Sequence, residues 1–122
     1  MRKQIYVSGP MTGYKDFNRA AFEEARAKGE ALGYAMFIPG DGEEYSEAEV
    51  ENLSASPANR AKWMHKDFRF IVNHADEVWV LPGWMQSQGA RDEVRLAQVI
   101  GLPVVYAFSQ YPVYREVVTH VR

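Results

Sequence analysis

The chain has 122 residues, of which 47% are hydrophobic and 25% are charged, and its formal net charge is −2. This length fits one domain with its own core, so we expect a single domain over residues 1–122 that folds without a disulfide or metal. The near-neutral charge excludes the strongly basic surface of a protein that binds a nucleic acid polymer or an anionic membrane.

Cysteine and histidine usage limits the chemistry further. The absence of cysteine excludes disulfides and thiolate zinc sites. His65, His74 and His120 show no ligand spacing, so we expect no metal and no cofactor. The apolar run behind Met1 stops at Ser8, which is too short for a signal-peptide core or a bilayer span. We therefore expect a cytoplasmic protein.

Apolar runs alternate with helical patterns along the chain. The runs predict strands at Ile5–Val7, Ala35–Ile38, Val78–Leu81 and Leu102–Tyr106. The helical periodicity predicts helices at Phe17–Leu32, Pro57–Ala75 and Gly89–Ile100. The acid-rich stretch Asp41–Glu51 predicts an exposed loop with one helical turn after Ser46, and the tail to Arg122 one short helix.

Continuous apolar strands between helices are typical of a parallel sheet that is covered on both faces. We therefore expect an α/β fold with a single doubly wound sheet of flavodoxin or Rossmann type and four to five strands. Ligands of such sheets bind beyond the carboxyl ends of the strands. The loops Ser8–Gly13 and Pro82–Gln88 should converge at that crevice.

Asp67 stands where a helix should be apolar. It lies three residues after Met64 and four before Ile71, so it projects from a predicted core stripe. The stripe comprises Met64, Phe68, Ile71, Val72 and Ala75. An unpaired buried carboxylate costs several kcal/mol, so a fold keeps one only with partners or a purpose. The alternative is that Asp67 bonds a neighbouring backbone group.

Glu93 repeats this pattern in the next predicted helix. It falls on the face expected to be buried, which comprises Ala90, Val94, Ala97 and Ile100. It also follows the crevice loop directly, in what we expect to be the first turn of the helix. The alternative is a first-turn acid that only stabilises its own helix through the dipole.

Several segments together resemble the nucleoside 2-deoxyribosyltransferase superfamily, most of all its short phage and bacterial members. The similarity runs from Ile5 to about Tyr106 and rests on the order of Tyr6–Gly13, Asp67, Ala75–Val78, Ser87–Glu93 and Gly101–Val104. The resemblance implies a flavodoxin-like fold and cleavage of the N-glycosidic bond of a deoxynucleoside or its monophosphate.

The resemblance also implies roles for single residues. Glu93 would be the nucleophile, Asp67 the acid that assists the leaving base, and Tyr6 the residue that orients the nucleophile. The sugar and base pocket would be lined by Ser8, Gly9, Pro10 and Met11, and the sugar 5′ end or its phosphate would be contacted by Ser87 and Gly89. Thr12 stands where the monophosphate-hydrolysing branch has arginine, which leaves the need for a 5′-phosphate open.

The leading hypothesis is therefore an enzyme that acts on a small nucleoside or nucleotide, by hydrolysis rather than transfer to a second base. A non-catalytic nucleotide-binding or sensing module on the same fold is the alternative, since fold does not determine function. A structural or interaction protein would give no reason for acids on two core stripes. We also expect a homodimer or larger homo-oligomer, because relatives complete their pockets across a subunit interface. A chain this short also leaves several aromatic residues to cover, namely Trp63, Phe70, Tyr111 and Tyr114.

Overall fold

The computed structural model describes residues 2–39, 57–106 and 115–116. These residues form one sheet with strand order β2-β1-β3-β4-β5. The strands are β1 (Gln4–Ser8), β2 (Ala35–Phe37), β3 (Glu77–Val80), β4 (Val104–Tyr106) and β5 (Arg115–Glu116). The first four strands run parallel to one another, and the two-residue β5 pairs antiparallel with β4 at the edge.

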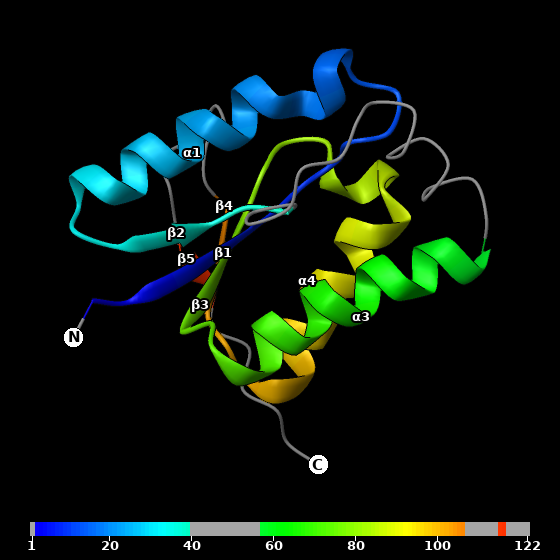
Figure 1. Ribbon diagram of the computed structural model, residues 1–122. Coiled ribbons are helices and arrows are strands. Elements are labelled where there is room, and N and C mark those ends of the chain that lie inside the picture. Colours follow the sequence, from blue (N-terminus) through cyan, green and yellow to red (C-terminus); the bar gives the residue numbers. More distant parts are fainter. Residues whose placement is uncertain (1, 40–56, 107–114, 117–122) are drawn as a thin grey trace.

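Helices cover both faces of this sheet (Figure 1). Helix α1 (Arg19–Ala31) lies over one face, and α3 (Pro57–Asn73) and α4 (Gln88–Ile100) lie side by side over the other. Two short turns, η1 (Lys15–Asn18) and η2 (Trp84–Gln86), precede α1 and α4. The predicted doubly wound α/β fold is confirmed.

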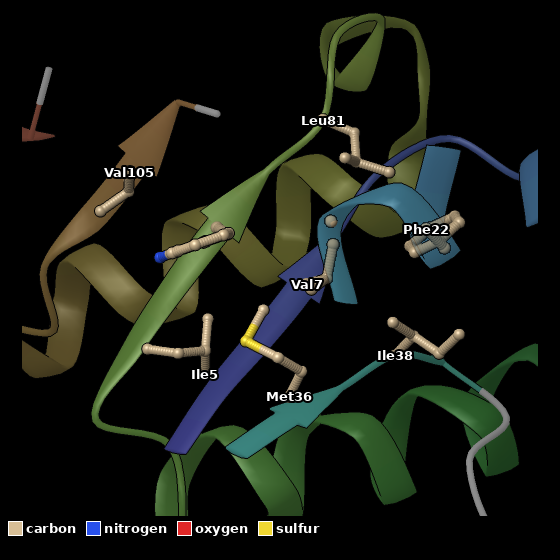
Figure 2. Close-up of a cluster of buried hydrophobic side chains, with 9 residues drawn as sticks. Ile5, Val7, Phe22, Met36, Ile38, Leu81 and Val105 are labelled. Carbon is tan, nitrogen blue, oxygen red and sulfur yellow. The ribbon is translucent and has the colours of Figure 1, made fainter. Parts of the chain in front are cut away.

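The alternation of side chains in β1 divides the core into two clusters. Ile5 and Val7 face α1 and join a cluster with Phe22, Met36 and Leu81, shown in Figure 2. The residues between them face the other way, so that Tyr6 packs in a second cluster under α3 and α4, with Ile71, Val78, Val94, Ala97 and Val104. The hydroxyl-bearing side chains of β1, Tyr6 and Ser8, therefore point towards α3 and α4, on the face of the sheet opposite α1.

Helix α1 begins two residues later than predicted, because the chain is left-handed just before it. Asp16, Phe17 and Asn18 have φ values of 49°, 52° and 64°, which non-glycine residues adopt only at a cost of about 1–2 kcal/mol each. The Asn18 side chain holds this turn by donating from Nδ2 to the Pro10 carbonyl oxygen at 3.0 Å. The end of the helix follows the prediction, with Gly33 at φ +87° after it.

Three apolar residues of the predicted helices are exposed, and two of them, Val72 and Ile100, were predicted to face the core. Val72 is 55% exposed because it lies one residue, or about 100° of helical rotation, from the fully buried Ile71. Leu32 (61% exposed) follows the end of α1, and Ile100 (42% exposed) is the last residue of α4. Both lie beyond the helical turns that pack on the sheet.

Some predictions concern residues that the structure describes only in part. The acidic stretch Asp41–Glu51 and its predicted helical turn lie outside the described residues. In the tail, where one helix was predicted, the described residues Arg115–Glu116 form β5. Within the described ranges, no helix is both long and apolar enough to cross a membrane.

Candidate functional site

The loops that follow β1 and β3 meet at the carboxyl edge of the sheet, as their positions predict. The Leu81 N–H donates to the Ser8 carbonyl oxygen at 2.9 Å. Gly9 lies so close to this strand that an added Cβ would stand 2.8 Å from the Leu81 Cβ. Further out, a Cβ on Gly83 would stand 2.5 Å from the Tyr14 hydroxyl. The two loops therefore touch around the predicted crevice.

Glu93 enters this region from α4, and its place in the helix differs from the prediction. The helix begins at Gln88, with Ser87 as its cap: the Ser87 Oγ accepts a hydrogen bond from the Ala90 N–H at 3.2 Å. No acidic residue lies in the first turn. Glu93 lies in the second turn and is only 6% exposed, so the expectation that it is a first-turn acid is wrong.

Both oxygens of the Glu93 carboxyl are held by hydroxyl groups of β1. The Tyr6 hydroxyl donates to Oε2 at 2.7 Å, and the Ser8 hydroxyl donates to Oε1 at 2.7 Å. Tyr6 is 2% exposed and Ser8 is fully buried. These are short, buried hydrogen bonds to a carboxyl group, a type that is stronger than bonds between neutral groups when the carboxyl is ionised.

The surroundings of Glu93 favour its protonated form. Burial, followed by the negative charge of Asp67 and a hydrogen bond with it, raises the pKa of Glu93 to about 8, although the hydrogen bonds from Ser8 and Tyr6 act in the opposite direction. Asp67 is half-buried on α3. A pKa of about 8 means that Glu93 is mostly protonated at neutral pH, next to the carboxyl group of Asp67.

Tyr6 remains a hydrogen-bond donor over the whole physiological range. Its burial, followed by the charges of Glu93 and Asp67, raises the pKa of the Tyr6 hydroxyl well above its ordinary value. The Tyr6 ring is flanked by Phe70 of α3 at 6.0 Å between ring centroids, and Phe37 lies 4.3 Å from Phe70. This aromatic packing supports the hydroxyl from the β2 side of the sheet.

The remaining predicted site residues lie around this cluster with separate contacts. Pro10 is buried, whereas Met11 packs against the core cluster on the α1 face, away from Glu93. The Ser87 hydroxyl is engaged as the helix cap. Gly89 is half-buried at the start of α4, and an added Cβ there would meet no atom within 4 Å. The structure thus brings together Tyr6, Ser8, Asp67 and Glu93. The other predicted site residues lie in the loop after β1 or at the start of α4, namely Gly9, Pro10, Met11, Ser87 and Gly89.

A small cavity of about 190 Å³ lies beside this cluster, at the carboxyl ends of β3 and β4. It is lined by Val80, Leu81, Pro82, Gly83, Trp84, Met85, Gln86 and Tyr106. The Trp84 and Tyr106 rings are 5.9 Å apart. Glu93 does not line this cavity, so the cavity and the carboxyl pair are separate features of the same edge.

A second acid as buried as Glu93 was not predicted from the sequence, because the predicted third strand begins one residue too late. Glu77, the first residue of β3, is 1% exposed. Its carboxylate accepts from Trp79 Nε1 at 2.9 Å and pairs with Lys3 Nζ at 3.3 Å. Its position two residues before Trp79 puts both on one face, which was the available signal. Glu77 lies at the amino end of the sheet, away from the crevice.

The site contains chemistry for moving a proton and for attacking an electrophile. Glu93 and Asp67 supply two interacting carboxyl groups, and Tyr6 and Ser8 supply fixed donors. In the described part of the chain, no three His, Asp or Glu side chains gather in a way that would hold a metal ion.

Comparison with known proteins gives one result that covers most of the chain. None of the curated proteins matches it. A family model described as "Domain of unknown function (DUF4406)" matches residues 3–106, a span that includes all four residues of the carboxyl cluster. The chain therefore belongs to the DUF4406 family.

Proposed function

We propose that this protein cleaves the N-glycosidic bond of a deoxynucleoside or deoxynucleoside monophosphate, with Glu93 as the nucleophile. The observation that carries the proposal is the buried Glu93 carboxyl with both oxygens held by Tyr6 and Ser8 at 2.7 Å. The resemblance to the nucleoside 2-deoxyribosyltransferase superfamily supports it independently, because Glu93, Asp67 and Tyr6 stand at that superfamily's catalytic positions.

The two carboxyl groups suit the electronic demands of this reaction. A glycosidic bond breaks through an oxocarbenium-like state, which a nearby carboxylate stabilises and traps covalently. When Glu93 passes its proton to Asp67, one Glu93 oxygen bonds to the anomeric carbon as the carbon–nitrogen bond breaks. The bond's electron pair goes to the base nitrogen, which takes the proton from Asp67. Water activated by the Asp67 carboxylate then releases the sugar and restores Glu93.

The second candidate is a nucleotide-binding or sensing module. The raised pKa of Glu93, about 8, favours this alternative, since a protonated carboxyl is a poor nucleophile but a good hydrogen-bonding group. Such a module would bind its ligand without turnover and would be stabilised by it.

A panel of deoxynucleosides and their 5′-monophosphates separates the two. Each compound is incubated with the protein, released base is measured by chromatography, and the melting temperature is recorded in parallel. Base release supports the enzyme. A rise in melting temperature with no released base for any compound supports the binding module.

Replacing Asp67 tests the proton path. Asp67→Asn should lower base release by about 10²- to 10⁴-fold, because the leaving base loses its proton donor. The loss should be smaller for bases that leave easily. The variant also lacks the charge that raises the pKa of Glu93, so the rise of kcat/KM with pH should move to lower pH. Equal losses for good and poor leaving bases would contradict this assignment.

We expect activity without a metal ion. Carboxylate attack at an anomeric carbon needs no Lewis acid, and the cysteine-free sequence offers only three unspaced histidines. Base release should be unchanged after treatment with a chelator and gel filtration. Activity that is lost on chelation and recovered with one divalent ion would refute this expectation.

We also propose that the protein is a homodimer or larger homo-oligomer. Apolar side chains are exposed near the ends of the neighbouring helices α3 and α4, with Val72 at 55%, Val99 at 40% and Ile100 at 42%. Of the aromatic residues that suggested this, Phe70 is packed within the chain. The side chain of Trp63, and both Tyr111 and Tyr114, lie outside the described residues. Sedimentation at micromolar concentration should show a dimer or larger species, and a monomer alone would rule out this assembly.

A further inference from the structure

Ser8 has no surface through which it can touch a ligand in this structure. It is fully buried, and its hydroxyl donates to Glu93 Oε1 at 2.7 Å. The resemblance assigned Ser8 to the sugar and base pocket, whereas in this structure the Ser8 hydroxyl contacts the Glu93 carboxyl. Its neighbour Gly9 approaches Leu81 so closely that the backbone at this point has little freedom to turn Ser8 outward.

The two donors bind different oxygens at different depths. Ser8 is the last residue of β1, and Tyr6 lies two residues earlier, so Ser8 is about 6–7 Å nearer the carboxyl edge along the strand. Ser8 holds Oε1 and Tyr6 holds Oε2. Oε1 is therefore held by the donor that lies nearer the carboxyl edge of the sheet.

We infer that Ser8 is a positioning residue that, together with Tyr6, clamps the Glu93 carboxyl and presents Oε1 to the anomeric carbon. The inference rests on the proposed function for the identity of the reaction, but the clamp itself exists without substrate. Each carboxylate oxygen has a second lone pair, so Oε1 can accept from Ser8 and still attack. The hydroxyl favours the ionised carboxylate, because it donates to the charged form.

The clamp predicts how Glu93 titrates. Among the residues that the structure describes, the ionisable groups that act on Glu93 are Tyr6 of β1 and Asp67 of α3. Both remain in a Ser8→Ala variant. Losing the Ser8 hydrogen bond should then raise the pKa of Glu93 further, by up to about one pH unit. A Thr12→Ala variant, which removes an exposed hydroxyl from the same loop, should leave the pKa of Glu93 unchanged.

The first measurement needs no substrate. The protein is labelled with ¹³C at the glutamate side-chain carboxyl, the Glu93 signal is identified by its absence in Glu93→Gln, and it is titrated in wild type, Ser8→Ala and Thr12→Ala. A titration that moves to higher pH only in Ser8→Ala supports the clamp. A Ser8→Ala titration that coincides with wild type, in a variant whose melting curve shows a folded protein, overturns it, whatever the protein's function is.

The second measurement uses a compound that the panel identifies as a substrate. Ser8→Ala should lower kcat by about 10- to 100-fold, as expected for one charge-assisted hydrogen bond, with KM nearly constant. The rise of kcat/KM with pH should move to higher pH, by the same amount as the Glu93 titration in this variant. Ser8→Thr, which keeps the hydroxyl, should recover part of the rate. A raised KM with an unchanged kcat and pH profile would make Ser8 a substrate contact and overturn the positioning role.

Discussion

Glu93→Gln should reduce base release by three or more orders of magnitude and leave the protein folded. Glutamine keeps the size of the side chain, and its carbonyl oxygen can accept one of the two hydrogen bonds now donated by Tyr6 and Ser8. It has no charged oxygen to attack a sugar, so the covalent step is lost, an effect of roughly 10³-fold or more for a nucleophile that acts within a catalytic unit. Base release and melting temperature are measured on the same preparations.

Glu77 provides a matched control for this experiment. It is also a glutamate with almost no exposure, but it lies at the amino end of β3 and pairs with Lys3 and Trp79. Glu77→Gln should lower stability, because it breaks a buried pair, and should leave kcat of the folded protein near the wild-type value. A Glu93→Gln protein that releases base at a near-normal rate would end the catalytic assignment.

The second large effect is a pH dependence of stability that comes from Glu93. In the unfolded chain this carboxyl ionises near pH 4.3, whereas in the folded protein its pKa is raised to about 8, chiefly by burial. Between these values the folded protein holds the extra proton, so raising the pH favours unfolding. Below about pH 4.3 the carboxyl is protonated in both states, so the folded protein loses no stability. Above about pH 8 the loss of stability is complete.

Glu93→Gln removes this titration. Its free energy of unfolding should therefore rise relative to wild type by up to about 1.4 kcal/mol for each pH unit between about pH 5 and pH 8. In Asp67→Asn, the free energy of unfolding should change with pH over a narrower range. The reason is that this variant lacks the charge that helps to raise the pKa of Glu93. Urea unfolding at a series of pH values gives these differences. Parallel curves for wild type and Glu93→Gln would show that the carboxyl is not held in its protonated form.

Local periodicity explains why so much of the site could be predicted. The alternation of a strand places Tyr6 and Ser8 on one face and Ile5 and Val7 on the other, whatever the strand pairs with. Helical spacing places Glu93 with Ala90 and Ala97, and all three are buried. The two unusual acids were visible because they interrupt apolar stripes that are properties of the sequence.

Element boundaries were less predictable, because they depend on capping and on backbone strain. Ser87 caps α4 and starts it at Gln88, which moves Glu93 out of the first turn and removes the dipole as an explanation for it. The left-handed run at Asp16–Asn18 delays α1, and such a run of non-glycine residues has no reliable pattern in the sequence. Glu77 was missed for a related reason, because a charged residue at a strand end reads as a loop.

The sequence by itself determined the fold class, the inward faces of β1 and α4, and the presence of two acids that a core would not otherwise keep. Only the tertiary structure decided that these groups meet. The bonds from Tyr6 and Ser8 to Glu93 join residues 87 and 85 positions apart, and they form because β1 pairs with β3 while α4 packs back across β1. Periodicity specifies which way a side chain points, whereas strand order and helix placement specify what it points at.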